Sequence, residues 1–554
     1  MNITQAFRSS IAPGRLALIL GSLAGLAVLL TLGGPGITID EPLDVRPGRK
    51  YVDTLAREGL GFFDRATVDR VFRDNAEHPP LGRWLLGIAS ILGQPLELFI
   101  QGSADPLGLY LWAGRLAPAF GFAALVGLVV HASARRYGQT AGWAAGFSLL
   151  VMPRVFAHAH LGALDTFIAL FWTLALLAAD RALTSRRPLL AMTAAGGIWS
   201  LALLTKIHAW FLIPVVFVWA FVRLRQPVRS LIAFTLWVAT GLSLFVLGWP
   251  WLWYDTLSRL RGYLGTGVDR TTLRVLYFGT VYADREVPWH YPWFYFAVTI
   301  PLGLHLLGLL GLWRGARSAR SDPFPMLLAG SIILFLVVFS TRIPVYDGER
   351  LFLVVFPLWS IFIGLGFSAL WERLHTRKLP KLGLAFALFG QGYGVVALHP
   401  FGLSYYNALV GGLAGAERLD LELTYWNDPV DRVLLNRLAR VLPPHAPAAL
   451  VPTLYPGQGL MTTNRALAGR STILADQEAL SVPGWIVVSR RTAYWPLGLR
   501  EKVARGKMIM ERRRQGVWLS AIYDLTPETP TVGTVGQGSS PIVQAPTSQS
   551  ADDL

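Results

Sequence analysis

Apolar runs long enough to cross a membrane recur between residue 16 and residue 398, and no other feature constrains the fold as much. A spanning helix needs about 20 predominantly apolar residues. Only 15% of the residues are charged and 53% are hydrophobic, whereas a soluble domain carries about 25% charged residues. The sequence therefore predicts a polytopic α-helical membrane protein. Eleven segments are candidate spans: 15–33, 111–131, 139–157, 160–180, 189–205, 208–223, 229–250, 291–313, 324–341, 350–371 and 380–398.

The basic residues distinguish the two sides of the membrane. The formal net charge is +16, which in a soluble protein would suggest a nucleic-acid partner. Here the basic residues lie in every second short loop, as the positive-inside rule requires of cytoplasmic loops. We therefore expect a cytoplasmic N-terminus, an exterior C-terminus and no nucleic-acid partner. These residues are Arg8, Arg15, Arg135, Arg136, Arg181, Arg186, Arg187, Arg223, Arg225, Arg229, Arg314, Arg317, Arg320, Arg373, Arg377, Lys378 and Lys381.

The first apolar segment is interpreted as a retained helix. Arg8 and Arg15 precede it as they would in a signal peptide, but no small-residue cleavage site of the Ala-x-Ala type follows. The chain contains no cysteine, which excludes disulfides, thiolate metal sites and cysteine nucleophiles.

Three exterior regions are too long to be simple connectors: residues 34–110, residues 251–290 and everything after residue 399. The first contains amphipathic stretches that suit helices lying on the membrane surface, followed by a short apolar run at 79–93. We expect a membrane domain over 1–398, an exterior α/β domain over 399–525 and a disordered tail over 526–554. The strand-like runs of the exterior domain are Ala448–Val451, Ser471–Leu474, Trp485–Ser489 and Val517–Tyr523.

The first exterior region begins with two adjacent carboxylates, Asp40 and Glu41. At headgroup depth, a carboxylate can deprotonate an acceptor hydroxyl beside a membrane-bound leaving group; the alternative is an acidic helix cap before Pro42. His78 precedes two prolines that fix the start of the next apolar helix. Its imidazole would bind a carboxylate or a phosphate, or merely cap a turn.

Charged residues also lie at the outer ends of the predicted spans. Asp165 is the most informative, because an ionisable group within an apolar segment is costly unless it faces the bundle interior or water. Arg154, Lys206, Arg342 and Arg350 lie where the phosphate of a lipid would be. Arginine binds phosphate with a bidentate fork and lysine as a point charge; the alternative for each is a side chain that extends to the interface.

A metal site is not expected. His158 and His160 lie close to Asp165 in the sequence, but residues two positions apart on a helix point in different directions. No cofactor is predicted, and dependence on a metal is left open. His290, in the aromatic part of the second exterior region, is a weaker candidate for the same cavity.

Four motifs resemble GT-C glycosyltransferases of the protein O-mannosyltransferase and aminoarabinose-transferase type. They are Asp40-Glu41, the run from His78 to Gly82, Leu164-Asp165-Thr166 and Leu203-Leu204-Thr205-Lys206. The segments Pro288–Pro292, Ser404–Asn407 and Tyr425-Trp426 look like those of a bacterial subgroup. The exterior domain does not look like the β-trefoil of eukaryotic mannosyltransferases, which argues against a protein acceptor.

The resemblance implies transfer of a sugar from a polyprenyl-phosphate donor to a lipid, glycan or protein acceptor outside a bacterial inner membrane. Asp40 would be the general base, with Glu41 and His78 positioning base and acceptor. Asp165 would orient the acceptor or the sugar. Lys206, Arg154 and Arg350 would hold the phosphate.

Two other interpretations fit part of the sequence. A secondary transporter or flippase for an anionic or glycolipid substrate would use Asp165, but such transporters commonly carry internal repeats, and none is found here. A membrane scaffold that binds envelope polymer would explain the exterior domain but not Asp40, His78 or Asp165.

Overall fold

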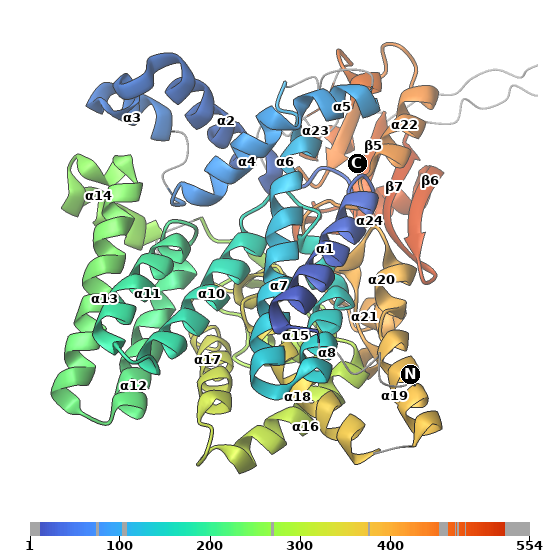
Figure 1. Cartoon of the computed structure of the whole chain (residues 1–554). Coiled ribbons are helices and arrows are strands. Elements are labelled where there is room, and N and C mark those ends of the chain that lie inside the picture. The colour runs from blue at the N-terminus through green and yellow to red at the C-terminus, as the bar shows by residue number, and fades with distance from the viewer. Residues whose placement is uncertain are drawn as a thin grey trace, which may run out of the picture.

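A computed structural model shows a helical bundle with further helices and a sheet at one end (Figure 1). It describes residues 11–73, 77–101, 108–266, 271–374, 377–453, 464–470, 472–473, 476–481 and 484–526. The predicted tail, apart from residue 526, and residues 471 and 474 of the predicted strand 471–474 lie outside the described residues.

Seven helical segments of the described chain are long and apolar enough to cross a membrane. An eighth span is possible if α15 (Tyr291–Thr299) and α16 (Leu302–Ser318), which meet at an angle of 111°, are counted together. The protein is therefore a multi-pass membrane protein. The seven are α1 (Pro13–Thr31), α6 and α7 (Leu111–Gly114 and Leu116–Tyr137), α10 (Asp165–Leu183), η3 and α12 (Ile207–Phe211 and Leu212–Leu224), α13 (Pro227–Gly248), α18 (Val355–Arg373), and α19 and α20 (Lys378–Gly390 and Tyr393–Leu398).

Each of the eleven predicted spans contains a helix, which confirms the fold class, but three are shorter than predicted. Helices α11 (Pro188–Leu203) and α17 (Phe324–Val338) have 16 and 15 residues. The segment 139–157 divides into α8 (Gln139–Leu150) and α9 (Pro153–His158), because Pro153 ends one helix and begins the next. By length and composition the number of spans is seven or eight rather than eleven.

Small residues allow the membrane helices to approach closely. A Cβ atom on Gly311 of α16 would lie 1.9 Å from the Phe362 carbonyl oxygen, and one on Gly366 of α18 would lie 1.9 Å from the Leu307 carbonyl oxygen. Small residues serve this purpose in membranes, where helix association depends on van der Waals packing. Helix α18 is consequently buried along nearly its whole length, whereas α19 is largely exposed.

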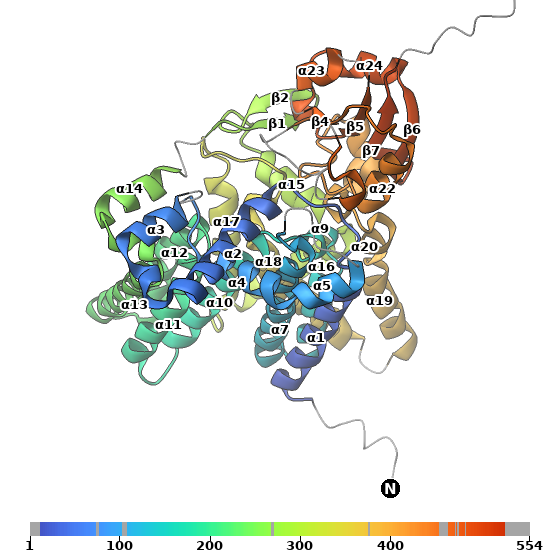
Figure 2. The same ribbon diagram turned by 90° about the horizontal axis from the view of Figure 1, so that it is seen from above.

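The first exterior region folds into short helices at one end of the bundle, where Figure 2 shows it from above. They are α2 (Asp40–Glu58), η2 (Gly59–Phe63), α3 (Arg65–Phe72), α4 (Leu81–Leu92) and α5 (Gln94–Gln101). Helices α2 and α4 touch through glycines, since a Cβ atom on Gly87 would lie 2.2 Å from the carbonyl carbon of Gly48.

The second exterior region contributes η4 (Pro250–Trp253), α14 (Thr256–Thr266) and a hairpin of β1 (Arg274–Tyr277) and β2 (Thr280–Ala283). Helix α14 joins the first region through ion pairs. Arg259 contacts Asp69 at 2.6 Å, and Arg65 contacts Asp255 at 2.5 Å. The two exterior regions therefore pack against each other over the bundle (Figure 2).

The C-terminal part contains a five-stranded sheet in the order β4-β3-β5-β7-β6. Strand β3 (Ala448–Val451) pairs in parallel with β4 (Thr472–Ile473) and β5 (Trp485–Ser489), while β7 (Val517–Asp524) pairs antiparallel with β5 and β6 (Lys507–Arg514). Leu434 and Leu438 of α22 (Arg432–Val441) pack with residues of one face of the sheet. Residues of α23 (Asp476–Ser481) and α24 (Leu499–Arg505) pack with those of the other. A sheet-containing C-terminal region is thus confirmed.

A segment without long helices links the membrane bundle to this sheet. It contains η6 (Gly402–Ser404), η7 (Ala408–Val410) and α21 (Gly412–Arg418), followed by residues 419–431. Several of its residues are buried, among them Tyr406, Tyr425 and Trp426. This linking segment lies between the bundle and the sheet and supplies residues to the site described next.

Candidate active site

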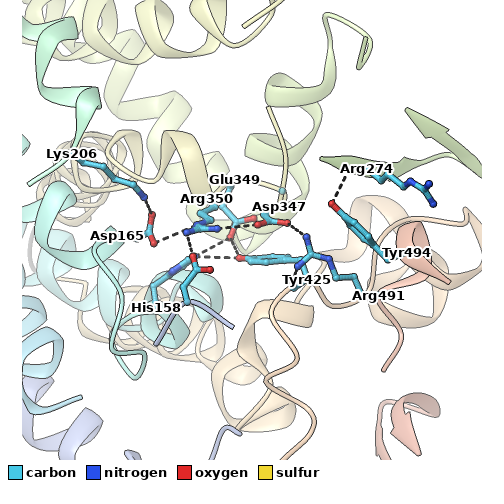
Figure 3. Close-up of polar contacts among 12 residues, drawn as sticks. His158, Asp165, Lys206, Arg274, Asp347, Glu349, Arg350, Tyr425, Arg491 and Tyr494 are labelled. Atoms are coloured by element: carbon cyan, nitrogen blue, oxygen red, sulfur yellow. Dashed lines mark hydrogen bonds and ion pairs between the residues drawn. The ribbon is translucent and has the colours of Figure 1, made fainter. Parts of the chain in front are cut away.

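Four of the residues singled out from the sequence meet at one end of the bundle. Lys206 Nζ lies 2.6 Å from Asp165 Oδ1, and Arg350 Nε lies 3.5 Å from Asp165 Oδ2. The Nη2 atom of Arg350 donates to Asp40 Oδ2. Figure 3 shows the line of contacts from Lys206 through Asp165 to Arg350. We call Asp40, Asp165, Lys206 and Arg350 the central cluster.

Both carboxylates of the central cluster stand at the beginning of a helix. Asp40 is the first residue of α2 and Asp165 the first residue of α10, where the helix dipole favours negative charge. The two cations come from the turns that follow or precede spans: Lys206 lies between α11 and η3, and Arg350 begins η5 (Arg350–Phe352).

The members of the central cluster differ in exposure. The Asp165 and Lys206 side chains are 2% and 5% exposed, and that of Arg350 is 10% exposed. The Asp40 side chain is 24% exposed. Asp40 is therefore the most exposed member of the central cluster.

Two buried arginines hold the helix that carries Asp40. Glu41 accepts from Arg115 Nε at 2.6 Å and from Arg115 Nη2 at 2.8 Å. Arg83 Nε donates to Asp44 Oδ1 at 3.0 Å, and burial raises the pKa of the Asp44 carboxyl to about 6. Breaking such a buried pair is costly, so α2 and Asp40 are fixed in place.

Glu41 does not join the central cluster. Besides Arg115, its two oxygens accept from the backbone N–H of Thr38 at 2.7 Å and of Gly162 at 2.9 Å. The side chain is fully buried. These contacts connect α2 to neighbouring loops and to Arg115, rather than to Asp40 or Arg350.

His78 lies beside the central cluster and is half-buried. Burial lowers the pKa of its imidazole well below the ordinary value, and the charge of Arg83 acts in the same direction. The charges of Lys206 and Arg350 also contribute to this lowering. His78 is therefore neutral here and is able to accept or donate a hydrogen bond, but not to act as a cation.

Arg154 belongs to a second, buried group that contains Glu349. Its Nη1 atom lies 2.5 Å from Glu349 Oε2, and its Nε atom donates to the Tyr405 carbonyl at 2.9 Å. His158 Nε2 lies 3.9 Å from Glu349 Oε1, and the Tyr425 hydroxyl lies 3.4 Å from the same oxygen. Burial raises the pKa of the Glu349 carboxyl while Arg154 opposes the rise.

Two predicted residues are found elsewhere. His290 is exposed, and its Nδ1 atom lies 2.8 Å from the Tyr277 hydroxyl in the β1–β2 region. Arg342 is exposed in the loop after α17. Within the part of the chain that the structure describes, neither residue has a hydrogen bond or an ion pair with the central cluster.

Several residues around Arg350 were not expected from the sequence. Asp347 Oδ2 accepts from Arg350 Nη1 at 3.1 Å, and the Arg350 guanidinium lies 4.1 Å from the Trp426 ring centre. Asp347 and Glu349 belong to the run Tyr346-Asp347-Gly348-Glu349-Arg350 before a span. Acidic residues at the end of an apolar segment could have identified both as candidate site residues. Arg491 contacts Asp347, but the sequence around Arg491 contains no apolar segment or motif that marks it as a site residue.

Among the described residues, no group of three or more histidine, aspartate or glutamate side chains has the arrangement of a metal site. His158 and Asp165, considered together from the sequence, belong to different contacts: the first approaches Glu349 and the second binds Lys206.

Comparisons with known proteins concern the family and the fold of the chain. Residues 77–251 match the model of the dolichyl-phosphate-mannose-protein mannosyltransferase family. The chain is similar to ArnT from Cupriavidus metallidurans, solved in the apo state and bound to undecaprenyl phosphate. The sequence identities are 15% and 16%, and the TM-score is 0.51 for both. The alignments cover 92% of this chain and 97% and 98% of the ArnT chains.

A search of curated proteins finds no match for the chain. The likeness to ArnT, which extends over nearly the whole of both chains, shows the fold. Together with the family match over 77–251, it confirms the GT-C resemblance drawn from the four motifs.

Proposed function

We propose that this protein is an integral membrane glycosyltransferase. It moves a sugar from a polyprenyl-phosphate donor to a lipid, glycan or protein acceptor at the outer face. Asp40 carries this proposal, because it is the accessible carboxylate of a cluster whose two cations lie at the same end of the bundle. ArnT, which has the same fold, has been solved with undecaprenyl phosphate bound, which supports a donor of this lipid class.

In the proposed reaction, the acceptor oxygen forms a bond to the anomeric carbon of the sugar. The bond between that carbon and the phosphate oxygen breaks, and its electron pair leaves with polyprenyl phosphate. Asp40 accepts the proton of the acceptor hydroxyl, as a general base within hydrogen-bond reach would. The protein forms no covalent intermediate in this scheme.

Arg350 and Lys206 stabilise the phosphate that leaves. Cations already oriented in a water-poor site stabilise developing negative charge without reorganisation. Asp165 keeps both cations in place, since it contacts Lys206 at 2.6 Å and Arg350 at 3.5 Å. The 3.5 Å contact joins Arg350 Nε to Asp165 Oδ2, and neither of these buried atoms has a hydrogen bond to another described residue.

The position of the central cluster favours an enzyme over a transporter. Secondary transporters place their sites near the bilayer midplane and are commonly built from internal repeats. Here the central cluster lies at one end of the bundle, and the sequence shows no internal repeat. At the opposite end, Asp180 accepts from Arg223 Nη2 at 2.6 Å and from Arg136 Nη1 at 3.3 Å.

The location follows from the same proposal. The membrane domain of residues 1–398 would lie in a bacterial inner membrane with a cytoplasmic N-terminus, and residues 399–525 would form the exterior domain. The basic loops support this orientation, because Arg136 and Arg223 lie at the end of the bundle opposite Asp40.

Turnover of radiolabelled polyprenyl-phosphate sugars by the purified protein in detergent tests the proposal. We expect wild type to release sugar or polyprenyl phosphate, and Asp40→Asn to lose this release. Glu58→Gln is the matched control, since Glu58 lies on the same helix but pairs with Arg70 at the surface. Equal turnover in wild type and Asp40→Asn would overturn the mechanism. Proteoliposome transport that needs Asp165 but not Asp40 would favour a transporter.

A further inference from the structure

We propose that Arg491, in the C-terminal region, is a positioning residue that holds Arg350 in its working orientation. This inference rests on the proposed function. Arg491 follows β5, and its hydrogen bonds to described residues go to Tyr425 and Asp347 rather than to Asp40, Asp165 or Lys206. It acts instead through the two neighbours that hold the Arg350 guanidinium.

The first neighbour is Asp347, which divides its two carboxylate oxygens between two arginines. Oδ1 accepts from Arg491 Nη2 at 3.1 Å, and Oδ2 accepts from Arg350 Nη1 at 3.1 Å. Figure 3 shows this bridge between the two guanidinium groups. The Asp347 side chain is 6% exposed, so water does not replace a lost arginine freely.

The backbone around Asp347 needs this support. Asp347 has φ of 57° and Gly348 has φ of 64°. Glycine adopts such angles readily, but aspartate does so at a cost. Contacts from the surrounding structure must hold a residue in this left-handed backbone region. Arg491 supplies one such contact to Asp347, three residues before Arg350.

The second neighbour is the Tyr425-Trp426 step of the linking segment. Arg491 Nη1 donates to the Tyr425 carbonyl oxygen. The next residue, Trp426, places its ring 4.1 Å from the Arg350 guanidinium carbon. Arg491 therefore bonds to both structures that confine Arg350: the carboxylate that pairs with it and the backbone of the ring that stacks on it.

Arg491 is itself held by the turn in which it lies. The Tyr494 ring centre is 4.7 Å from its guanidinium carbon, and the Tyr494 hydroxyl accepts from the Arg274 backbone N–H at 2.9 Å. The Glu422 carboxylate accepts from the backbone N–H of Thr492 at 2.6 Å and of Ala493 at 3.0 Å. The turn is thus fastened to β1 and to the linking segment.

The adjacent arginine provides a matched control. Arg490 Nη1 contacts Glu417 at 2.6 Å, and its guanidinium lies 4.7 Å from the Trp518 ring centre. Like Arg491, it is a paired and stacked arginine of the same turn. Unlike Arg491, it has no hydrogen bond or ion pair with Asp347, Tyr425 or any member of the central cluster among the described residues.

The test compares Arg491→Met with Arg490→Met in the full-length protein. With polyprenyl-phosphate sugar as substrate, we expect Arg491→Met to lower kcat by about tenfold and Arg490→Met to stay near wild type. Hydrogen exchange of residues 345–351 should be faster only in Arg491→Met. This second measurement requires no substrate, so it still tests the positioning if the wild type shows no turnover and the proposed function fails.

Coupling between the two arginines distinguishes positioning from a general structural role. In an Arg350→Lys background, Arg491→Met should add less than about a twofold further loss, because the group that it positions has already been changed. A full additional tenfold loss, or wild-type exchange of residues 345–351 in Arg491→Met, would overturn the inference. If Arg491→Met does not fold, Arg491→Lys takes its place, since one ammonium cannot serve both acceptors at once; wild-type kcat and exchange in that variant would then overturn it.

Discussion

Asp40 and Asp165 share a single guanidinium, that of Arg350, although one begins an exterior helix and the other begins a membrane span. Lys206 adds a second cation on the side of Asp165. In the proposed reaction, the phosphate of the donor would meet two positive charges already oriented by carboxylates, and the more exposed Asp40 would face the acceptor.

The first prediction is that turnover depends on the planar, forked guanidinium of Arg350. Arg350→Lys should lower kcat by at least about a hundredfold, because an ammonium cannot contact Asp40, Asp165 and Asp347 in the directions of the planar fork. Steady-state turnover of polyprenyl-phosphate sugar measures this loss. Arg342 is exposed in the loop between α17 and α18, so Arg342→Lys should retain wild-type turnover. A fully active Arg350→Lys variant would contradict the role of the fork.

Glu41 is predicted to affect stability more than chemistry. Glu41→Gln removes the charge that compensates buried Arg115, and the loss of one partner of a buried pair costs about 3–5 kcal/mol. Thermal unfolding in detergent should therefore occur at a clearly lower temperature. Glu58→Gln breaks a surface pair with Arg70, which is worth at most about 1 kcal/mol. Similar unfolding temperatures for the two variants would show that the Glu41 pair is not needed.

Asp428 is predicted to make stability depend on pH. Burial raises the pKa of its carboxyl to about 7, from an ordinary value of 3.8, while Arg154 and Arg115 oppose the rise. A carboxyl whose pKa is higher in the folded state favours folding below its unfolded pKa, and this contribution is lost as pH rises through the folded pKa. Asp428→Asn should therefore gain stability over wild type as pH increases from 4 to 8.

The difference in melting temperature between Asp428→Asn and wild type, measured across this range, isolates the contribution of Asp428 from that of other groups. Asp420→Asn changes an exposed carboxylate of the same segment, and its difference from wild type should not vary in this way. A constant difference for Asp428→Asn would refute the assignment.

The contact between α2 and α4 is predicted to have no room for a side chain at position 87. A Cβ atom on Gly87 would lie 2.2 Å from the carbonyl carbon of Gly48, so Gly87→Ala must push the two backbones apart. Overpacking of this kind costs about 1–3 kcal/mol, and it should also lower turnover because α2 carries Asp40. Gly262→Ala in α14, where nothing lies within 4 Å of the added carbon, should leave both unfolding temperature and turnover unchanged or improved.

The central cluster could be predicted from the sequence because its members share one property. Asp40, Asp165, Lys206 and Arg350 are charged residues next to the outer ends of apolar segments, and the membrane brings such ends to a common depth. The fold class followed from the same segments. Their number as spans did not, because Pro153 divides one segment and α15 and α16 meet at 111°.

Pairing between distant residues could not be predicted in this way. Glu41 is adjacent to Asp40 in the sequence, yet its carboxylate faces Arg115 on another helix. Arg154 resembled a phosphate ligand, but it pairs with Glu349 inside the protein. Arg491 lies in a soluble-looking region whose position over the bundle depends on tertiary packing, and its contact with Asp347 leaves no local pattern in the sequence.

The bridge from Arg350 through Asp347 to Arg491 also has a consequence for biosynthesis. A ribosome makes Asp40 and Lys206 long before it makes Arg491, and a chain still being inserted into the membrane carries these charges without the last of their supports. The completed arrangement thus requires the C-terminal region to have been translated and folded against the bundle. Nascent chains held in the insertion machinery should consequently be unable to consume donor lipid.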